Sequence, residues 1–598
     1  MIKKLARSIR QYKTPSVLAP AFMLAEVVLE CIIPLVMMRL IDTIQTADSI
    51  KPTLIYGGIL LILAFASLAS GILSGHFAAI ASTGVAKNLR KDMYYKIQDF
   101  SFANIDKFST AGLITRLTVD VANVQNAYLM IIRMAVRAPL MMIFSVVMTV
   151  TVSPKLSLIF AVIVPLLALG MFLIIRYVYP IYHKAFKRYD TFNESIQENV
   201  RGMRVVKAYV REDYEKKKFK SESDALCKIF TKTDGILMIS TPMMQFAVFT
   251  AVLLIAALGS LLIVNTFGGY EIVGGVEVAH FGELSIGGLS SLITYTMQIL
   301  SSLMMFAMVI TMITMSAESG RRIVEVLDEQ STIVSPENAA LSVEDGSVEF
   351  DSVSFKYSEN AEREALDNIN LKIPSGSTVG IIGGTGSGKS SLVQLIARLY
   401  DVSGGSVKVG GKDVRSYDVA ALRDAVAMVL QKNTLFSGSV KENMRWGNEN
   451  ATDEEIVEAC KLAQADEFVR AMPNGYDTHI EQGGANVSGG QKQRLCIARA
   501  LLKKPKVLIL DDSTSAVDTK TDAALRAAFR DGLKDTTKII IAQRIASVQD
   551  ADRIVVLDDG KIDAVGTHDE LLKSCEIYRE VYFSQNGASE KGGDTDAR

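Results

Sequence analysis

The chain has 598 residues and a formal net charge of −1, so no overall positive field favours nucleic acid as a partner. Its five cysteines are scattered, without a CxxC pair or a nearby histidine cluster, which argues against a disulfide framework and against a zinc site. The composition changes along the chain. Long apolar runs dominate up to about residue 318, and the remainder has the pattern of a soluble α/β domain.

The first part contains six apolar stretches, each long enough for the roughly 20 helical residues that cross a bilayer. They fall near 17–41, 53–80, 129–152, 156–179, 236–264 and 285–315. Lysine and arginine gather in the two long connections, after the second and fourth stretches, whereas the other loops contain only Lys51 and Lys155 as basic residues. The six stretches predict that residues 1–318 form an all-α domain of six transmembrane helices. The positive-inside rule predicts that both termini are cytoplasmic.

The two cytoplasmic connections are too long for simple turns, and their apolar residues keep a helical spacing. We interpret them as membrane helices that continue into the cytoplasm. Each connection would present a short turn-helix at its tip, near Ser109–Val121 and near Arg211. Generic amphipathic surface loops are the alternative.

Two acidic residues lie inside the first apolar stretch, where ionisable groups are candidates for function. Glu26 and Glu30 are four residues apart, hence on one helix face, and Pro34 follows them and should kink the helix. Either the two carboxylates line a water-filled pathway that suits cationic substrates, or they make a structural contact with another helix.

Other residues of the spans give weaker signals. The basic residues Arg133, Arg137 and Arg176 lie nearer the cytoplasmic ends, where snorkelling to the interface explains them. Met297 and Gln298 belong to a soft, methionine-rich set in the last span, of the kind that adapts to varied ligands. Helix packing or lipid contact would explain that set equally well.

Beyond a charged connector at 319–345, short β-rich runs alternate with helical segments over 346–585, and the tail 586–598 is predicted to be disordered. The string from Gly383 to Ser390 matches GxxxxGK[ST] and lies between an apolar strand and a helical segment, as this phosphate-binding loop requires. The predicted nucleotide-binding residues are Gly383, Gly384, Thr385, Gly386, Ser387, Gly388, Lys389, Ser390 and Ser391.

The chemistry of this loop indicates bound ATP and Mg²⁺. Glycines let backbone N–H groups close around phosphate oxygens, and the following helix adds the positive end of its dipole. Lys389 should reach the β- and γ-phosphates, and the Ser390 hydroxyl should bind Mg²⁺. A second apolar run, 507–510, ends at Asp511, which we expect on the Mg²⁺ side of the same site.

A further string, Val487-Ser488-Gly489-Gly490-Gln491, precedes another helical segment. It resembles the LSGGQ signature of ATP-binding cassette (ABC) transporters, with Val487 in place of leucine. The order of phosphate loop, glutamine loop (Gln431), signature, Asp511 strand and the Ser515–Asp518 segment is the ABC order. Six spans with two long cytoplasmic loops before such a domain resemble an ABC exporter over essentially the whole chain.

This resemblance implies a multidomain fold, in which the membrane domain is followed by an α/β P-loop NTPase cassette. It implies that Tyr357 stacks on adenine, that Gln431 joins Ser390 and Asp511 around Mg²⁺, and that Asp518 belongs to the D-loop. It also implies a dimer in which each nucleotide lies between one subunit's phosphate loop and the other's signature, here Ser488, Gly489, Gly490 and Gln491. The loop tips would act as coupling helices.

The sequence departs from the family at catalytic positions. The residue after Asp511 is normally a glutamate that orients the attacking water, and here it is Asp512. Gln543 occupies the position of the family's switch histidine. Gln482 occupies a position before the signature where glutamate is frequent. Aspartate withdraws its carboxylate by roughly 1.5 Å, and a misplacement of about 1 Å costs on the order of 10²-fold in rate. We therefore predict a site that holds MgATP and hydrolyses it poorly.

Paired changes of this kind resemble the degenerate half of a heterodimeric bacterial multidrug exporter. The partner would be a second half-transporter with the consensus glutamate and histidine, and the chain would lie in the bacterial plasma membrane and export small amphipathic or cationic molecules. Tolerated variants in a working homodimer are one alternative. An importer of the same fold, for instance for metal–chelator complexes, and an ATP-sensing regulatory subunit are two others.

Overall fold

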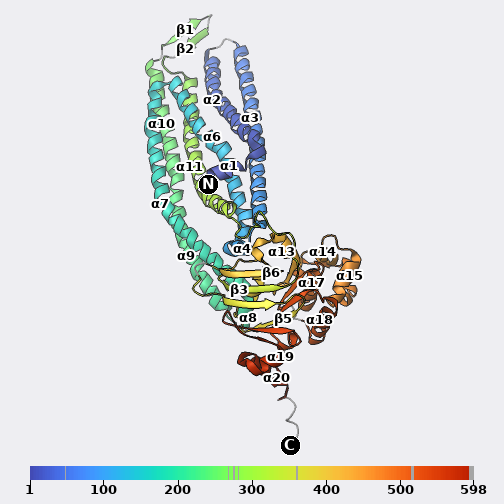
Figure 1. Ribbon diagram of the computed structural model, residues 1–598. Coiled ribbons are helices and arrows are strands. Elements are labelled where there is room, and N and C mark those ends of the chain that lie inside the picture. Colours follow the sequence, from blue (N-terminus) through green and yellow to red (C-terminus); the bar gives the residue numbers. More distant parts are fainter. Residues whose placement is uncertain are drawn as a thin grey trace. The chain divides into compact units, whose positions relative to one another are not determined.

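The computed structural model describes residues 1–46, 49–266, 268–273, 276–279, 282–358, 361–512 and 517–590. The chain forms two compact units (Figure 1). One comprises Met1–Gln98 and Ala111–Asp328, and the other comprises Asp99–Thr110 and Glu329–Arg598. The connector predicted at 319–345 is divided between them, because its first residues end the last helix of the first unit.

The first unit is built of helices, with one short hairpin. Its elements are α1 (Ile2–Arg7), η1 (Arg10–Tyr12), α2 (Lys13–Thr46), α3 (Ile50–Gln98), α5 (Thr110–Thr115), the π-helical turn η2 (Arg116–Asp120), α6 (Val121–Val152), α7 (Pro154–Arg201), α8 (Met203–Ala208), α9 (Glu212–Met238), α10 (Ser240–Thr266), β1 (Tyr270–Val273), β2 (Val276–Ala279) and α11 (Ile286–Asp328). Helix α2 packs against α3, α6 and α11, and α10 packs against α7 and α11.

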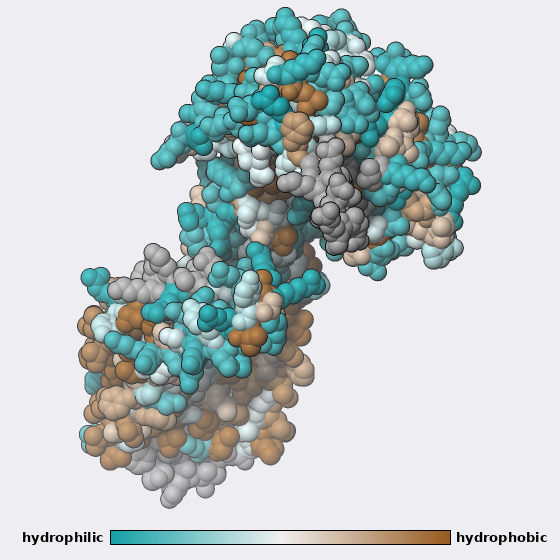
Figure 2. Space-filling model, turned by 90° about the horizontal axis from the view of Figure 1, so that it is seen from below, coloured by the Kyte–Doolittle hydropathy of each residue, from teal (hydrophilic) through white to brown (hydrophobic). Residues whose placement is uncertain are grey.

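Within the described residues, six helical segments are long and apolar enough to cross a membrane, which confirms the number of spans predicted from the sequence. They are Arg10–Gln45, Ile50–Gln98, Thr110–Val152, Pro154–Val178, Glu212–Thr266 and Ile286–Asp328. Figure 2 shows brown, apolar side chains over this part of the molecule and mostly teal ones over the other unit. Large apolar side chains that water would disfavour are exposed here, such as Phe65 and Leu158 at 69% and 68%, as expected of a surface that faces lipid.

The tip of the first cytoplasmic connection differs from the prediction. The short helix is α4 (Phe102–Phe108), whereas the predicted Ser109–Val121 forms α5, η2 and the start of α6. Ser101 and Asn104 form a capping box that begins α4, and Ser109, with φ of 54°, ends it. The second tip is α8, which lies just before Arg211 as expected.

Helix α4 belongs to the second unit. There the Tyr400 hydroxyl donates to Asp106 at 2.6 Å, and the Asn104 amide donates to Glu329 at 2.9 Å. The rings of Phe102 and Tyr400 meet edge to face at 6.0 Å. The tip of the first connection is therefore held by the part of the chain that follows the membrane helices.

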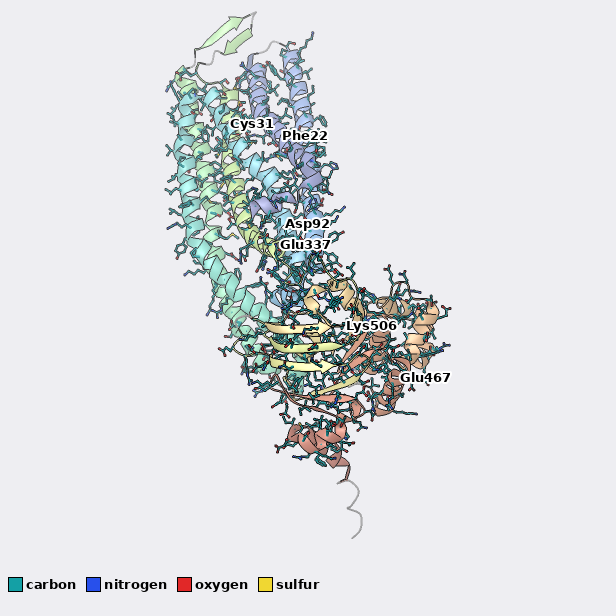
Figure 3. All side chains as sticks on the ribbon, in the orientation of Figure 1. Phe22, Cys31, Asp92, Glu337, Glu467 and Lys506 are labelled. Atoms are coloured by element: carbon teal, nitrogen blue, oxygen red, sulfur yellow. The ribbon has the colours of Figure 1, made fainter. Side chains whose placement is uncertain are left out.

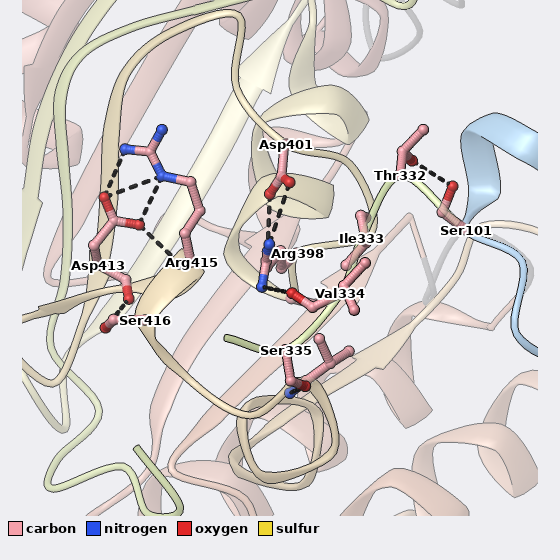
Figure 4. A network of polar contacts seen from close by, with 12 residues as sticks. Ser101, Thr332, Ile333, Val334, Ser335, Arg398, Asp401, Asp413, Arg415 and Ser416 are labelled. Atoms are coloured by element: carbon pink, nitrogen blue, oxygen red, sulfur yellow. Dashed lines mark hydrogen bonds and ion pairs between the residues drawn. The ribbon is translucent and has the colours of Figure 1, made fainter. Parts of the chain in front are cut away.

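The connector after α11 is fixed by a polar network (Figure 4). Ser101 and Thr332 share a hydrogen bond of 2.7 Å, which joins the connector to the residue that caps α4. The guanidinium of Arg398, a residue only 5% exposed, donates to the backbone oxygen of Val334 at 3.3 Å and to Asp401 at 2.9 Å. This short stretch therefore does not behave as a free linker.

The second unit contains two main sheets. One is antiparallel, in the order β4 (Leu366–Ile373), β3 (Val348–Phe355), β6 (Gly404–Val409), β7 (Lys412–Asp413). The other has the order β14 (Lys561–Gly566), β13 (Arg553–Asp558), β5 (Thr378–Gly383), β12 (Thr537–Ile541), β11 (Val507–Asp511), β8 (Val426–Val429), and only β14 runs antiparallel to its neighbour. Strand β11 is buried along its whole length, as its continuous apolar run predicts, and β12 is buried as well although it begins with Thr537 and Lys538.

Helices surround these sheets. They are α12 (Lys389–Ile396), η3 (Val414–Ser416), α13 (Val419–Ala425), α14 (Val440–Arg445), α15 (Asp453–Leu462), α16 (Asp466–Arg470), η4 (Gly475–Asp477), η5 (Gln482–Gly484), α17 (Gly489–Leu501), α18 (Thr519–Gly532), η6 (Ile545–Ser547), α19 (His568–Ser574) and α20 (Glu576–Glu590). A small pair, β9 (Gly438–Ser439) and β10 (His479–Ile480), lies beside α14. Helix α20 reaches into the segment 586–598 that the sequence predicts to be disordered, and 591–598 lie outside the described residues.

The packing of α11 on α2 generates a test. A Cβ at Gly287 would lie 2.3 Å from the backbone oxygen of Met38 and 2.7 Å from the Asp42 carboxylate, so Gly287→Ala should force the helices apart. Overpacking of this kind costs about 1–3 kcal/mol, and we expect a lower melting temperature of the purified protein in detergent. Gly57→Ala in α3 is the control, because no atom lies within 4 Å of its added Cβ. Equal melting temperatures for the two variants would contradict this packing.

Candidate nucleotide site

The phosphate-binding loop lies between β5 and α12, as the sequence predicts. Glycine is required at its two ends: a Cβ at Gly383 would lie 2.2 Å from the backbone oxygen of Leu557, and one at Gly388 would lie 2.6 Å from that of Ala365. Gly388 also has φ of 93°, a conformation that side chains disfavour. An added Cβ at Gly384 or Gly386 would meet nothing within 4 Å. The loop therefore rests on the protein at its ends and is open at its middle.

Lys389 brings a positive charge into this loop. Its ammonium group donates to the backbone oxygens of Gly383 at 2.8 Å and Gly384 at 2.6 Å and lies 3.4 Å from the Ser387 hydroxyl. Burial lowers the pKa of Lys389, and the negative charges of Asp511 and Asp512 oppose that shift. The charge is thus placed at the open part of the loop, where phosphate oxygens would meet it.

The two predicted Mg²⁺ ligands that lie farthest apart in the sequence come together at the end of β11. The Ser390 hydroxyl donates to the Asp511 carboxylate at 3.0 Å, and Asp511 is only 3% exposed. Burial raises the pKa of Asp511, the bond from Ser390 lowers it, and the neighbouring charge of Asp512 raises it. A cation at this position would favour the ionised carboxylate.

This donor set fits Mg²⁺. Among the described residues no group of three or more His, Cys, Asp or Glu side chains could hold a metal ion by itself. Mg²⁺ does not need such a cage, because it is usually held by one or two protein oxygens together with substrate phosphates and water. A hydroxyl and a carboxylate beside a phosphate-binding loop meet that requirement.

The two degenerate positions contact each other. The Gln543 side chain donates to the Asp512 carboxylate at 2.8 Å, and the Gln431 side chain also hydrogen-bonds to Asp512. Asp512 has φ of 49°, and its N–H donates to the backbone oxygen of Ile541 on β12. Burial raises the pKa of Asp512, while the bonds from Gln431 and Gln543 lower it. Sequence spacing alone did not reveal this contact.

Tyr357, expected to stack on adenine, is 51% exposed. Its hydroxyl shares a hydrogen bond of 2.8 Å with Ser391 of α12, and its ring meets Tyr400 edge to face at 5.3 Å. One end of Tyr357 is therefore anchored next to the phosphate-binding helix while much of the side chain remains accessible.

The signature residues form the start of α17. Ser488 accepts a hydrogen bond from the Gln491 N–H, and the Gln491 side chain accepts one from the Ser488 N–H at 2.9 Å, so the two close a capping box. Gly489 and Gly490 supply the first turn, whose free N–H groups favour an anion. Asp518 begins α18 in a similar way, by accepting from the Thr521 N–H at 3.0 Å, and Ser515 and Ala516 lie outside the described residues.

The acidic pair of the first span has a cationic partner. Arg137 on α6 donates to Glu26 and, through its other nitrogen, to Glu30 at 2.7 Å. Snorkelling is therefore the wrong explanation for Arg137, because its guanidinium bridges two carboxylates on α2. The matching opposite charges in spans one and three were the signal that could have predicted this contact.

The predicted pathway residue Gln298 has a structural partner as well. Pro34 lacks an N–H and leaves the Glu30 carbonyl without its helical donor, and the Gln298 amide approaches that oxygen at 3.4 Å. Ser145 donates to the other end of Gln298 at 3.1 Å. Met297, next to it on α11, is 44% exposed.

Nearby, the Tyr295 hydroxyl donates to the backbone oxygen of Cys31 at 2.7 Å. Cys31, labelled in Figure 3, lies on α2 and is a free, buried thiol. Its sulfur lies 3.8 Å from the Ser145 hydroxyl. The polar groups near Pro34 of α2 thus bond to α6 and α11.

Comparison with known proteins agrees with this architecture. Two family models match the chain, the ABC transporter transmembrane region over residues 17–303 and ABC transporter over residues 366–515. An uncharacterized ABC transporter ATP-binding protein of Bacillus subtilis, YfiB, is 36% identical over 98% of this chain and 99% of its own length. An ATP-dependent lipid A-core flippase of Desulfotalea psychrophila is 31% identical over 98% and 99%. A bacterial Atm1-family ABC exporter solved with ATP bound has the same fold, with a TM-score of 0.77, 22% identity and coverage of 98% and 99%.

Six membrane-spanning helices joined to an ATP-binding α/β domain define an ATP-driven membrane transporter. The chain belongs to the ABC transporter family, as a half-transporter of the exporter type.

We expect Lys389→Ala to weaken MgATP binding by about 10- to 100-fold, because a hydrogen bond to a charged group contributes about 1.5–3 kcal/mol. Equilibrium titration of the purified chain with a non-hydrolysable ATP analogue and Mg²⁺ measures the effect. Lys412→Ala, which removes an exposed lysine paired with Glu344, is the control. An unchanged affinity for MgATP in Lys389→Ala would contradict the assignment of Lys389 to phosphate binding.

Proposed function

We propose that this chain is one half of a heterodimeric exporter that uses ATP to move small amphipathic or hydrophobic, multidrug-type molecules across the bacterial plasma membrane. The observation that carries the proposal is the contact of Asp512 with Gln543, at the two positions where the family normally has glutamate and histidine. Both termini lie in the cytoplasm, in keeping with the distribution of lysine and arginine.

The contact supports slow hydrolysis at this chain's own site. The Asp512 carboxylate accepts hydrogen bonds from Gln543 and Gln431, so two neutral amides compete with an attacking water molecule for its oxygens. Gln543 remains uncharged, so its amide stabilises the charge that develops on the γ-phosphate less than a histidine cation would. Binding groups such as Lys389, Ser390 and Asp511 are in place, so MgATP is held and turned over poorly.

The signature supports a role in the partner's site. Ser488 and Gln491 form an ordered helix start that matches the family pattern, apart from Val487 in the first position. In a dimer this helix start would complete a site whose glutamate and histidine come from the other chain. One competent and one slow site follow, and ATP retained at the slow site biases the closed state of the dimer without driving each cycle.

The relatives support an amphipathic substrate. One of them, similar over nearly its full length, is by its name a flippase of lipid A-core. Exposed apolar side chains cover the helices of this chain, which gives such molecules access from the bilayer. Transport of amphipathic molecules is thus the function that the fold and the site support best.

The division of labour predicts asymmetric mutant effects on ATP turnover by the purified pair, with each change made in this chain alone. Asp512→Glu should raise turnover only modestly, because Gln543 remains, whereas Ser488→Ala or a change at Gly489 should lower it strongly, by about 10-fold or more. Asp512→Asn serves as the matched control for loss of the carboxylate. If Ser488→Ala is silent and Asp512→Asn abolishes turnover, this chain hosts the working site and the proposal is wrong.

We also propose that Glu26 and Glu30 favour cationic substrates, with Met297 and Gln298 on the same pathway. Both carboxylates bond to the single guanidinium of Arg137, and the Glu30 side chain is 25% exposed. Changing both residues to glutamine should impair export of a cationic dye more than export of a neutral one of similar size. Glu283→Gln, outside the spans, is the control. Equal loss for both dyes, or no loss, would mean that the pairing with Arg137 is purely structural.

A further inference from the structure

A glutamine of the C-terminal helix binds the backbone on both sides of Arg544, in the segment that carries Gln543. The Gln585 amide nitrogen donates to the backbone oxygen of Gln543 at 2.8 Å, and the Gln585 oxygen accepts the N–H of Ile545 at 2.9 Å. A side-chain amide has one donor end and one acceptor end, and here each end meets a complementary backbone group. This two-point contact fixes the amide in a single orientation.

The segment that Gln585 binds joins a strand of the main sheet to a single helical turn. It runs from the end of β12 at Ile541 to the single turn η6 at Ile545–Ser547, and Gln543 lies between these elements. The Ile545 N–H is the first of η6, and such N–H groups lack a partner within the helix. Gln585 supplies that partner from outside, and the same amide holds the Gln543 backbone.

Helix α20 is itself well anchored. Tyr578 is fully buried, and its hydroxyl lies 2.7 Å from a ring nitrogen of His568 on α19. The Tyr578 N–H donates to the sulfur of Cys575 at 3.3 Å. Gln585, which lies further along the same helix, is therefore held in place and can position the segment from Gln543 to Ile545.

The side chain of Gln543 completes the connection, because it donates to Asp512 at 2.8 Å. We propose that Gln585 is a positioning residue of the nucleotide site: through its two backbone bonds, α20 sets the direction of the Gln543 side chain toward Asp512 and toward the γ-phosphate of bound ATP. This inference rests on the proposed role of Gln543 at the γ-phosphate. Within the described part of the chain, the hydrogen bonds of Gln585 go to the backbone of Gln543 and Ile545, so we assign its effect on the nucleotide to Gln543.

The position of Gln543 predicts a specific readout. ADP lacks the γ-phosphate, so a loss of positioning should weaken the binding of ATP and leave that of ADP unchanged. We expect Gln585→Ala to lower the ratio of ATP to ADP affinity by about 3- to 10-fold, the amount that one or two hydrogen bonds supply. A general loss of structure would instead weaken both nucleotides together.

The experiment uses the purified full-length chain, titrated with Mg²⁺ and either a non-hydrolysable ATP analogue or ADP. Gln585→Glu retains an acceptor for the Ile545 N–H but sets a carboxylate oxygen against the Gln543 backbone oxygen, so it should also lower the affinity ratio, at least as far as Gln585→Ala does. Ser584→Ala, at the exposed neighbouring position of α20, is the matched control. Hydrogen exchange of the Ile545 amide should accelerate in Gln585→Ala and not in Ser584→Ala.

Gln543→Ala separates this inference from the proposed function. If Gln543→Ala lowers the affinity ratio and Gln585→Ala in that background adds nothing further, both assignments hold. If Gln543→Ala lowers the ratio and Gln585→Ala alone does not, the positioning role of Gln585 is wrong while the role of Gln543 stands. If Gln543→Ala leaves the ratio unchanged, the role of Gln543 at the γ-phosphate is wrong, and the inference fails with it.

Discussion

The hydrogen bond between Ser390 and Asp511 joins two parts of the chain that are more than a hundred residues apart, and the nucleotide site depends on it. Ser390 lies in the first turn of α12, directly after the loop that follows β5, and Asp511 ends β11. Both strands pair in parallel with β12, so their carboxyl ends point to the same edge of the sheet. Because that sheet is buried, a shift of register would move polar residues into its core and would also separate the hydroxyl from the carboxylate.

The membrane part obeys a related constraint, since lipid offers no hydrogen bonds to polar groups. Pro34 interrupts α2, and the oxygen it leaves free at Glu30 is met by Gln298 of α11. Arg137 of α6 meets the two carboxylates on the preceding turns of α2. Pro34 and the charged groups thus lie together on three helices, and breaking one contact leaves a buried group without its partner, which costs several kcal/mol.

Sequence reasoning succeeded where the signal is local. The phosphate-binding loop follows from eight consecutive residues, the signature from five, and the six spans from length and apolarity. It was less successful where partners come from distant segments. The contacts of Asp512 with Gln543 and of Gln585 with the Gln543 backbone have no spacing that a single sequence could reveal, whereas the contact of Arg137 with Glu26 is indicated only by their opposite charges within the spans. The short helix of the first cytoplasmic connection lies earlier in the chain than predicted. Ser109 ends this helix with a positive φ, and serine is not a residue type that indicates the end of a helix.

The assignment of residues 99–110 to the second unit has a mechanical consequence. The chain passes from one unit to the other at 98/99, at 110/111 and again at 328/329. Two units joined by a single flexible segment of backbone can rotate independently of each other. Here there are three covalent crossings, and two of them flank the short segment 99–110, which is bonded to the rest of its unit through Asn104 and Asp106. The crossings fall at the end of α3, at the start of α5 and at the end of α11, so the backbone ties the ATP-binding unit to three separate helices of the membrane unit.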